Sequence, residues 1–375
     1  MYRTSFKGTL LPLTGLMLMM TLLVATSPAQ ARDLAYATYL PPSHPTTQGI
    51  QLFSELVSKK TDGAVKFSVY PSASLSSGKG MLASIRQGII DAGFIVGIYT
   101  PGDLPANSLL SDLSFLNTNP RVAAAAVTDT IFNDCKQCME EYKKNNVRFL
   151  GTYSTTPYEL MCKSDFSGGM NFDGLRIRVA GGEFGKWVSE LGGIPVDIAN
   201  NEAYQAMQRN QLDCVHGATA WLDALSLNEV VGSVIDQPMG AYYGGALFDV
   251  RTSVWQDLSK QEKQALLDAT PAAISRTVYK YIEQVQHARK AAIAKGVKYL
   301  EPSDELRKKH ASFAKSQVER VAKTARGRGV KNPEKLLESL QKNYQKWSGL
   351  IGDKDITENE YTALLKEHLY SKVSL

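Results

Sequence analysis

The sequence is poor in the features that mark several large classes of protein. Only 4 cysteines occur in 375 residues, too few for a disulfide framework in a chain of this length. The 42 basic residues are nearly balanced by 37 acidic ones without a dense basic block, so nucleic acid is not expected as the main partner. With 43% hydrophobic and 21% charged residues, the chain is globular in composition and long enough for two domains.

Apolar stretches that could enter a membrane are confined to the N-terminus. Arg3 and Lys7 precede an apolar stretch from about Leu10 to Ala25, and the A-x-A pattern Ala29-Gln30-Ala31 follows. This order is typical of a secretory signal peptide. A transmembrane anchor is the alternative, but the stretch is short and is broken by a proline and a glycine. We predict a signal peptide over residues 1–31, cleaved after Ala31, and a soluble, periplasmic mature protein.

Short strands and helices alternate along the mature chain. In its first half we expect strands over 34–39, 65–69 and 92–96, and helices over 49–60, 81–85 and 120–144. A βαβαβ order of this kind is typical of a parallel sheet with helices on both faces.

A second α/β set begins near residue 148. Here we expect strands over 148–153, 158–162, 176–179 and 242–250, and helices over 183–191, 202–209, 341–350 and 361–369. Capping boxes at Ser259-x-x-Glu262 and Thr357-x-x-Glu360 should begin helices. Without a flexible linker in between, we expect the chain to cross between the two domains several times.

The most enzyme-like pattern is Cys135-Lys136-Gln137-Cys138. A CxxC at a helix N-terminus can carry a reactive thiolate, but here the expected position is inside the 120–144 helix. A redox pair, a structural disulfide and two buried thiols all stay open. Cys162 and Cys214 stand alone in the sequence, so a zinc site is not expected. Motifs for a nucleophile, a metalloprotease helix or a phosphate loop do not occur.

The strand Arg176-Ile177-Arg178-Val179 carries a different signal. Both arginines share one face, opposite Ile177 and Val179. An arginine at the C-terminal end of such a strand points toward the crevice where ligands bind in α/β sheets, and its guanidinium fits a carboxylate. A surface arginine in an ion pair is the alternative.

Several ordered motifs resemble the solute-binding proteins of TRAP (tripartite ATP-independent periplasmic) transporters, the C4-dicarboxylate-binding family. They are Val69-Tyr70-Pro71-Ser72, Ile85-Arg86-Gln87-Gly88-Ile89-Ile90-Asp91, Gly174-Leu175-Arg176-Ile177-Arg178-Val179, Glu202-Ala203-Tyr204-Gln205-Ala206-Met207-Gln208 and Trp255-Gln256-Asp257-Leu258-Ser259. The resemblance extends from about Tyr36 to Leu267.

The resemblance implies an α/β fold of two lobes with the ligand cleft between them and a long helix after Ser259 spanning both. It divides the chain into lobe I (32–153 plus about 243–283), lobe II (154–242 plus about 284–345) and a C-terminal helical extension (346–375). The solute's carboxylate would bind Arg178, and Arg176 would be structural. Further contacts would come from Tyr39, Ser77, Val96, Tyr158, Asn200, Gly217, Trp221 and Tyr242.

Departures from the family pattern bear on the ligand. Ser77, Val96 and Gly217 stand where members for sugar acids have acids or amides, and His216 replaces an acidic residue. Tyr39, Tyr99, Tyr158, Trp221, Tyr242 and Tyr243 suggest aromatic cleft walls instead. A smaller, less hydroxylated organic acid therefore fits better.

The implied function is capture of a small organic acid for ion-gradient-driven uptake. The partners would be the acid and the membrane permease subunits of a TRAP transporter, without nucleic acid. We expect a monomer with no metal, no cofactor and no catalytic residue. The alternatives are an exported thiol oxidoreductase using Cys135 and Cys138, the binding protein of an ATP-driven importer, and a sensor subunit.

Overall fold

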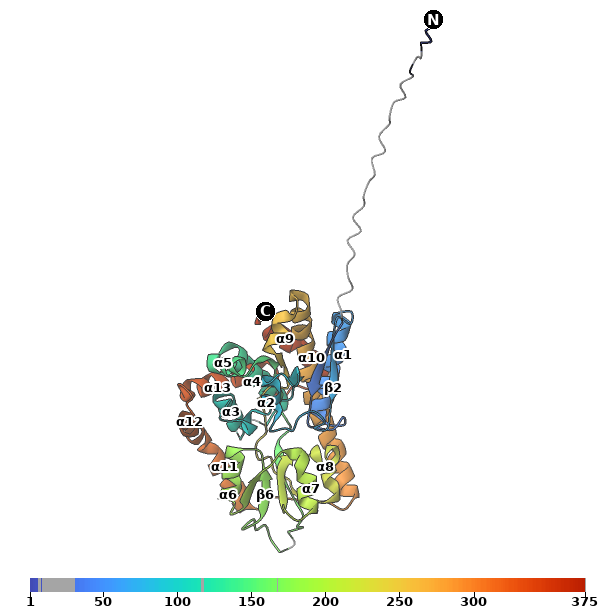
Figure 1. The fold of residues 1–375 in the computed structure, drawn as a ribbon. Coiled ribbons are helices and arrows are strands. Elements are labelled where there is room, and N and C mark those ends of the chain that lie inside the picture. Colours follow the sequence, from blue (N-terminus) through green and yellow to red (C-terminus); the bar gives the residue numbers. More distant parts are fainter. Residues whose placement is uncertain (6–7, 9–30, 116–117, 167, 375) are drawn as a thin grey trace. The chain divides into compact units, whose positions relative to one another are not determined.

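A computed structural model describes residues 1–5, 8, 31–115, 118–166 and 168–374 (Figure 1). Ala31–Leu375 form one compact unit, distinct from the first 30 residues. The apolar stretch of the expected signal peptide lies outside the described residues. Among those that are described, no helix combines the length and the apolar character needed to cross a bilayer.

The first lobe is built on a parallel sheet of order β2-β1-β3, with bounds Arg32–Ala37 (β1), Val65–Tyr70 (β2) and Ala92–Gly93 (β3). Leu34 and Tyr36 of β1 point into the core and pair in register with Phe67 and Val69 of β2. Helix α1 (Pro45–Lys60) begins where His44 accepts a hydrogen bond from the Thr46 N–H, and it buries Ile50, Phe53 and Val57. Helices α2 (Met81–Arg86), α3 (Pro105–Asp112), α4 (Pro120–Asn133) and α5 (Lys136–Lys144) and the antiparallel pair of β4 (Val147–Gly151) and β10 (Phe248–Arg251) complete this lobe.

The second lobe is built on a mixed sheet of order β11-β9-β5-β8-β6-β7. The bounds are Tyr158–Cys162 (β5), Arg176–Val179 (β6), Ile194–Asp197 (β7), Cys214–Ala218 (β8), Ser233–Ile235 (β9) and Lys298–Leu300 (β11). Helices α6 (Gly182–Glu190), α7 (Ala203–Gln208) and α8 (Trp221–Ala224) lie against it (Figure 1). Strand β8 is buried along its whole length, so both faces of the sheet are covered here.

Two chain segments cross between the lobes side by side. The N–H of Thr155 donates to the Tyr242 carbonyl at 2.9 Å, and the N–H of Tyr158 donates to the Gly240 carbonyl at 2.6 Å. Helix α10 (Lys260–Ala294) is a third connection, packing against α1 in the first lobe and α8 in the second. The expectation of several crossings is therefore confirmed.

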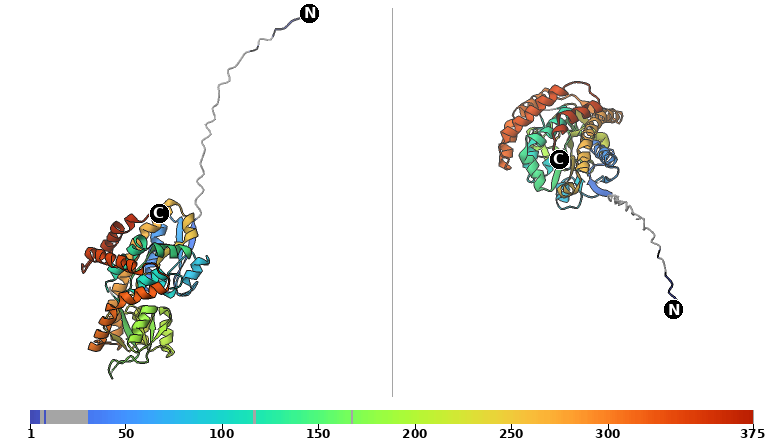
Figure 2. Two further views of the ribbon diagram at one scale, coloured as in Figure 1. Left: turned by 90° about the vertical axis from the view of Figure 1, so that its left-hand side faces the viewer. Right: turned by 90° about the horizontal axis from the view of Figure 1, so that it is seen from above.

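The last helices return to the first lobe. Helices α11 (Asp304–Lys315) and α12 (Gln317–Gly327) lead to α13 (Pro333–Leu350), which packs on α4, and to α14 (Glu358–His368), which packs on α10. Figure 2 shows the last of these helices, in red, on the outer side of the first lobe. In the core of this contact the indole N–H of Trp347 donates to Asp129 at 2.9 Å. The residue 346, where we placed the start of an extension, lies inside α13.

Several expected elements need correction. The helix expected over 120–144 is two helices, α4 and α5, separated at Asp134 and Cys135, so the CxxC lies at a helix N-terminus. The strand expected over 242–250 begins only at Phe248 as β10, because residues 239–244 pair with the first crossing segment. Helix α9 (Thr252–Asp257), α3 and strands β7, β8, β9 and β11 were not predicted. Both capping boxes, at Ser259 and Thr357, are confirmed.

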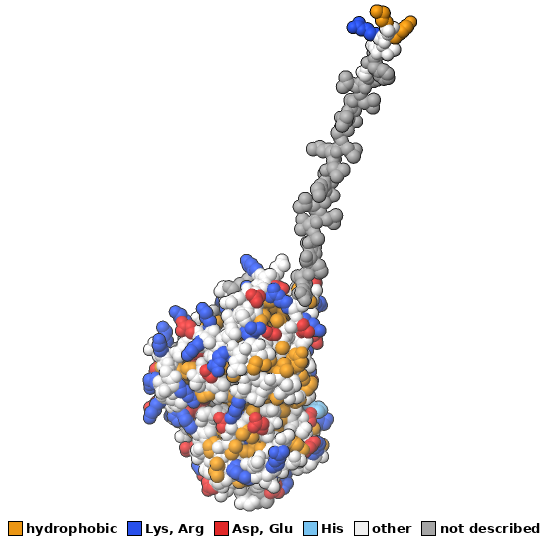
Figure 3. Space-filling view, viewed as in Figure 1, with side chains coloured by type: hydrophobic (Ala, Val, Ile, Leu, Met, Phe, Trp, Pro, Cys, Tyr) orange, Lys and Arg blue, Asp and Glu red, His pale blue; other side chains and the backbone are white. Residues whose placement is uncertain are grey.

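The surface carries both signs of charge. On the face seen in Figure 3, basic and acidic side chains are interspersed over both lobes. This agrees with the nearly balanced composition.

Candidate functional site

Arg178 is held in the middle of the second lobe's sheet. It lies on β6, paired in register with Val196 of β7 and Val215 of β8, and only 1% of the residue is exposed. Among the residues that the structure describes, it is the one buried Lys or Arg. Burying a guanidinium costs free energy unless hydrogen bonds or an opposite charge compensate it. The contacts of Arg178 therefore indicate which kind of ligand the site can hold.

The guanidinium of Arg178 is bonded only to neutral groups. Its Nε donates to the Ile198 carbonyl at 3.0 Å, one Nη to the His216 carbonyl at 3.2 Å, and the other Nη to the Tyr99 hydroxyl at 3.2 Å. Within the described part of the chain, no carboxylate forms an ion pair with it. Because a guanidinium has five N–H donors, one N–H on each Nη is left for a further acceptor.

Arg176, two residues earlier on the same strand, differs from Arg178 both in its exposure and in the partner of its guanidinium. Its guanidinium holds Asp213 in a two-point ion pair, with distances of 2.9 and 2.8 Å, and its side chain is 41% exposed. The charge of Arg176, the first residue of β6, is therefore already neutralised by Asp213. The contrast leaves Arg178 as the arginine of this strand that is free to hold an anionic ligand.

Trp221 and Gly217 shape one wall beside the guanidinium. The indole of Trp221 lies 5.3 Å from the Arg178 guanidinium carbon, within the range of a cation–π contact. A Cβ at position 217 would lie 2.2 Å from the indole ring, so only glycine lets the ring lie across strand β8 here. Both residues were predicted contacts, and they act together.

A cluster of aromatic rings adjoins the guanidinium through Tyr99. Tyr99 touches Arg178 through its hydroxyl, and Tyr39 lies 6.4 Å from the Tyr99 ring and stacks on Phe94 at 5.3 Å. The cluster, which we call the aromatic cluster, comprises Tyr39, Phe94, Tyr99, Tyr153, Tyr242 and Tyr281. Burial raises the pKa of Tyr39 and Tyr99 above their usual range, so both hydroxyls stay protonated and can donate.

Three members of the aromatic cluster were not predicted from the sequence: Phe94, Tyr153 and Tyr281. Tyr281 lies on α10 at helical spacing from the buried Ile274 and Val278, so the pattern indicates an ordinary core position. Phe94 follows β3 and Tyr153 follows β4, where apolar residues are expected in any α/β core. The signal that could have found them is the position just after a strand end.

The other predicted contacts differ in their burial and in their hydrogen-bond partners. Val96 and Asn200 are buried, and the Asn200 side-chain oxygen has no hydrogen-bond partner among the described residues. Tyr242 accepts a hydrogen bond from the Gly97 N–H at 3.2 Å within the aromatic cluster. Ser77 is exposed, and its hydroxyl accepts a hydrogen bond from the Gly80 N–H at 3.1 Å.

The rings of Tyr158 and His216 pack together, and the Tyr158 ring packs on Trp221. The Tyr158 ring is 5.2 Å from Trp221 and 5.4 Å from His216, and Phe184 closes the group. Burial, reinforced by the charge of Arg178, lowers the pKa of His216 to about 3. The imidazole is therefore neutral, with Nε2 3.1 Å from the Met239 carbonyl.

This buried histidine predicts acid sensitivity. Between about pH 6.5, where a free histidine titrates, and pH 3 the unfolded chain binds a proton that folded His216 refuses, so acid favours unfolding. One such proton contributes about 1.4 kcal/mol of unfolding free energy per pH unit. We expect the variant His216→Gln to lose stability less steeply than the parent across this window in urea unfolding. An identical slope for the two proteins would contradict the assignment.

Outside the aromatic cluster, a groove of about 550 Å³ opens beside Tyr39. It lies between the loops at 41–43 and 72 of the first lobe and residues 201–205 and 223–229 of the second. Tyr39 belongs to both the groove and the aromatic cluster, so the two adjoin each other.

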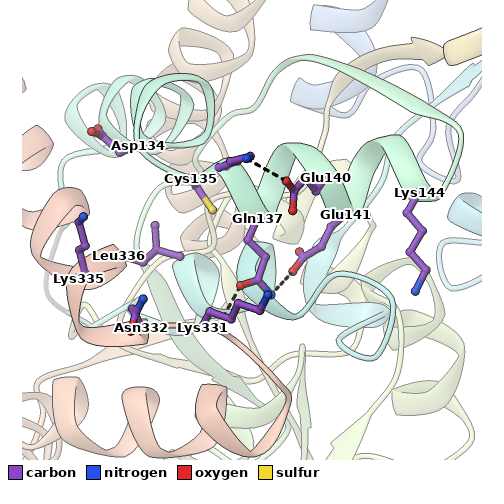
Figure 4. A pocket seen from close by; sticks show the side chains of 11 residues that line it. Asp134, Cys135, Gln137, Glu140, Glu141, Lys144, Lys331, Asn332, Lys335 and Leu336 are labelled. Atoms are coloured by element: carbon purple, nitrogen blue, oxygen red, sulfur yellow. Dashed lines mark hydrogen bonds and ion pairs between the residues drawn. The ribbon is translucent and has the colours of Figure 1, made fainter.

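The CxxC lies at a different groove, of about 560 Å³, between α5 and the start of α13 (Figure 4). Cys135 and Cys138 form a disulfide, and the residues are 3% and 0% exposed. Gln137 bridges the two helices by accepting a hydrogen bond from the Lys331 N–H at 3.1 Å. Charges of both signs line this groove, and it shares no residue with the site at Arg178.

The two remaining cysteines also form a disulfide. Cys162 and Cys214 face each other across the antiparallel pair β5–β8, with Cα atoms 4.0 Å apart. The expectation that these cysteines stand alone is wrong, because the strands bring together residues 52 positions apart in the sequence.

Two α/β lobes, with a buried arginine of the second bonded to a tyrosine hydroxyl of the first, have the architecture of a two-lobed periplasmic binding protein. The sequence model of bacterial extracellular solute-binding protein family 7 (DctP) matches residues 36–324, and the chain belongs to this family. A solute-binding protein of Chromohalobacter salexigens is 24% identical over 273 residues, covering 70% of this chain and 77% of the relative.

Solved structures of TRAP solute-binding proteins share the fold. One, from a marine metagenome and bound to metahydroxyphenylacetate, has a TM-score of 0.74 at 18% identity, covering 86% of this chain and 99% of that protein. Another, from Bordetella bronchiseptica with bound (R)- and (S)-mandelate, has a TM-score of 0.72 at 21% identity, covering 84% and 99%. The two-lobed fold inferred from the sequence is confirmed.

Proposed function

We propose that this solute-binding protein captures a small organic acid by its carboxylate on Arg178. The observation that carries the proposal is a guanidinium that is 1% exposed and bonded to two carbonyls and a hydroxyl, with no acidic partner in the described part of the chain. A carboxylate accepting the remaining N–H of each Nη would neutralise this charge by a two-point contact. Metahydroxyphenylacetate and mandelate, bound by two structural relatives, are both carboxylates.

The lobes would close over the acid. Two contacts in this structure cross between them near the site: the Arg178–Tyr99 bond, and a bond from Lys79 Nζ to the Asp197 carbonyl at 2.9 Å. Behind the site, the ion pairs Arg328–Asp112 and Arg320–Glu183 tie α3 and α6 to the α12 segment. The paired crossing segments at residues 153–158 and 239–244 would act as the hinge.

Closure gives a prediction for the protein in solution. Ligand gains contacts from both lobes only in the closed form, so it should shift the population toward that form. Small-angle scattering of the mature protein should show a smaller radius of gyration when a tight ligand saturates it. Identical profiles with and without ligand would contradict a hinge.

The proposed function also implies the compartment and the partners of the protein. Residues 1–31 would direct export and be removed after Ala31, and the two disulfides suit an oxidising compartment. The loaded protein would deliver its solute to the membrane permease subunits of a TRAP transporter. The chain would carry no catalytic residue, and the buried Cys135–Cys138 disulfide would be structural rather than part of an oxidoreductase.

A thermal-shift screen of the mature protein against organic acids tests this function. A ligand at 100 times its Kd stabilises the folded state by about 2.7 kcal/mol, which is readily measured. Hits should contain a carboxylate, and their methyl esters or amides, which lack the charge, should give no shift. If neutral esters shift the melting temperature as much as the acids, the carboxylate proposal is wrong.

A further inference from the structure

We infer that the solute is a monocarboxylate whose remaining part is a planar aromatic ring. This inference rests on the proposed function and narrows it. It follows from two features of the site that favour the same ligand: Arg178 is the one buried Lys or Arg in the described ranges, and two aromatic side chains, Trp221 and Tyr99, contact its guanidinium.

The charge fixes the number of carboxylates. Arg178 is the one buried Lys or Arg in the described ranges, and its three neutral partners leave two N–H donors, enough for one carboxylate. A second carboxylate enclosed with the first would lose its water without gaining a cation. Lys79, at the edge between the lobes, is already bonded to the Asp197 carbonyl and paired with its carboxylate at 3.6 Å.

The rings fix the shape of the rest. On one side the guanidinium lies against the Trp221 indole at 5.3 Å, and on the other it is bonded to Tyr99, from which the aromatic cluster continues through Tyr39 and Phe94. Rings of this kind pair with another ring in offset or edge-on geometry and gain more than from an aliphatic chain of equal area. A sugar acid would instead need several amide or carboxylate partners for its hydroxyls, whereas the side chains shown in contact with the guanidinium are those of Trp221 and Tyr99.

Binding of three probes by titration calorimetry separates the possibilities: benzoate, succinate and cyclohexanecarboxylate. Benzoate should bind at least roughly 100-fold more tightly than succinate, because the second carboxylate of succinate finds no buried cation. It should also bind at least roughly 10-fold more tightly than cyclohexanecarboxylate, which has a ring of similar size without a planar π-face.

Variants at two tryptophans test where the ring lies. Trp221→Leu should weaken benzoate at least roughly 10-fold while changing the binding of propionate, which has no ring, much less. Trp255, which is 8% exposed and lies under Arg148 in the first lobe, provides the control, since Trp255→Leu should leave benzoate binding unchanged.

The outcomes distinguish this inference from the function beneath it. Succinate binding as tightly as benzoate, or equal weakening of benzoate and propionate in Trp221→Leu, overturns the aromatic monocarboxylate while leaving acid capture intact. Failure of every carboxylic acid to bind the folded protein overturns the proposed function itself.

Discussion

Replacing Arg178 with alanine should weaken binding of the solute by about 2–5 kcal/mol, a loss of roughly 30-fold to several thousand-fold. The variant leaves a desolvated carboxylate without its cation, beside the neutral Tyr99 hydroxyl that Arg178 now contacts. Arg178→Lys should recover only part of the loss, since an ammonium cannot make the planar two-point contact. Calorimetry with the best acid from the thermal-shift screen measures all three proteins, and circular dichroism checks their folding.

Arg176→Ala is the matched control, because it removes the same side chain two residues away on the same strand. Arg176 is already paired with Asp213 and is 41% exposed, so its loss should change solute affinity by less than about threefold. If Arg176→Ala abolishes binding while Arg178→Ala binds like the parent, the roles of the two arginines are reversed. If both variants bind like the parent, the carboxylate is held elsewhere.

The sequence predicts the arginine strand well because its signal is local. Strand β6 runs over Arg176–Val179 as expected, and alternation alone places both arginines opposite Ile177. Which of the two is free to hold a ligand depends on Asp213, 37 residues further along the chain. Its carboxylate is paired with the Arg176 guanidinium. The family resemblance supplied that choice, while the residues by themselves left an ordinary ion pair open for either arginine.

Other parts of the site depend on backbone conformation that no pattern reveals. The loop before Ser77, which stays a predicted contact, turns through positive φ values of 57° at both Ser72 and Ala73, residues not usually found in that conformation. Tyr281 was not singled out because its spacing on α10 is that of an ordinary core residue. The break between α4 and α5 was hidden because Cys135 has no special propensity to cap a helix, although its sulfur accepts from the Cys138 N–H at 3.1 Å.

The second large effect concerns the two disulfides, which should differ in what they contribute to stability. The entropy lost by closing a loop in the unfolded chain grows with loop length. Cys162–Cys214 closes a loop with a separation of 52 residues, so its loss should cost about 4 kcal/mol of unfolding free energy. Cys135–Cys138, with a separation of 3, should cost about 2 kcal/mol by the same relation.

Paired serine variants allow the stabilities lost with each disulfide to be compared directly. All four residues are 0–3% exposed, so each pair of substitutions buries two new hydroxyls. Urea unfolding of Cys162→Ser/Cys214→Ser and Cys135→Ser/Cys138→Ser should rank the first as the less stable by about 2 kcal/mol. The Cys135→Ser/Cys138→Ser protein should bind the solute like the parent, since its groove shares no residue with the site at Arg178. Loss of affinity in that folded variant would instead assign the CxxC a switching or redox role. Equal stability of the two variants would mean that loop closure does not determine how much the Cys162–Cys214 disulfide contributes.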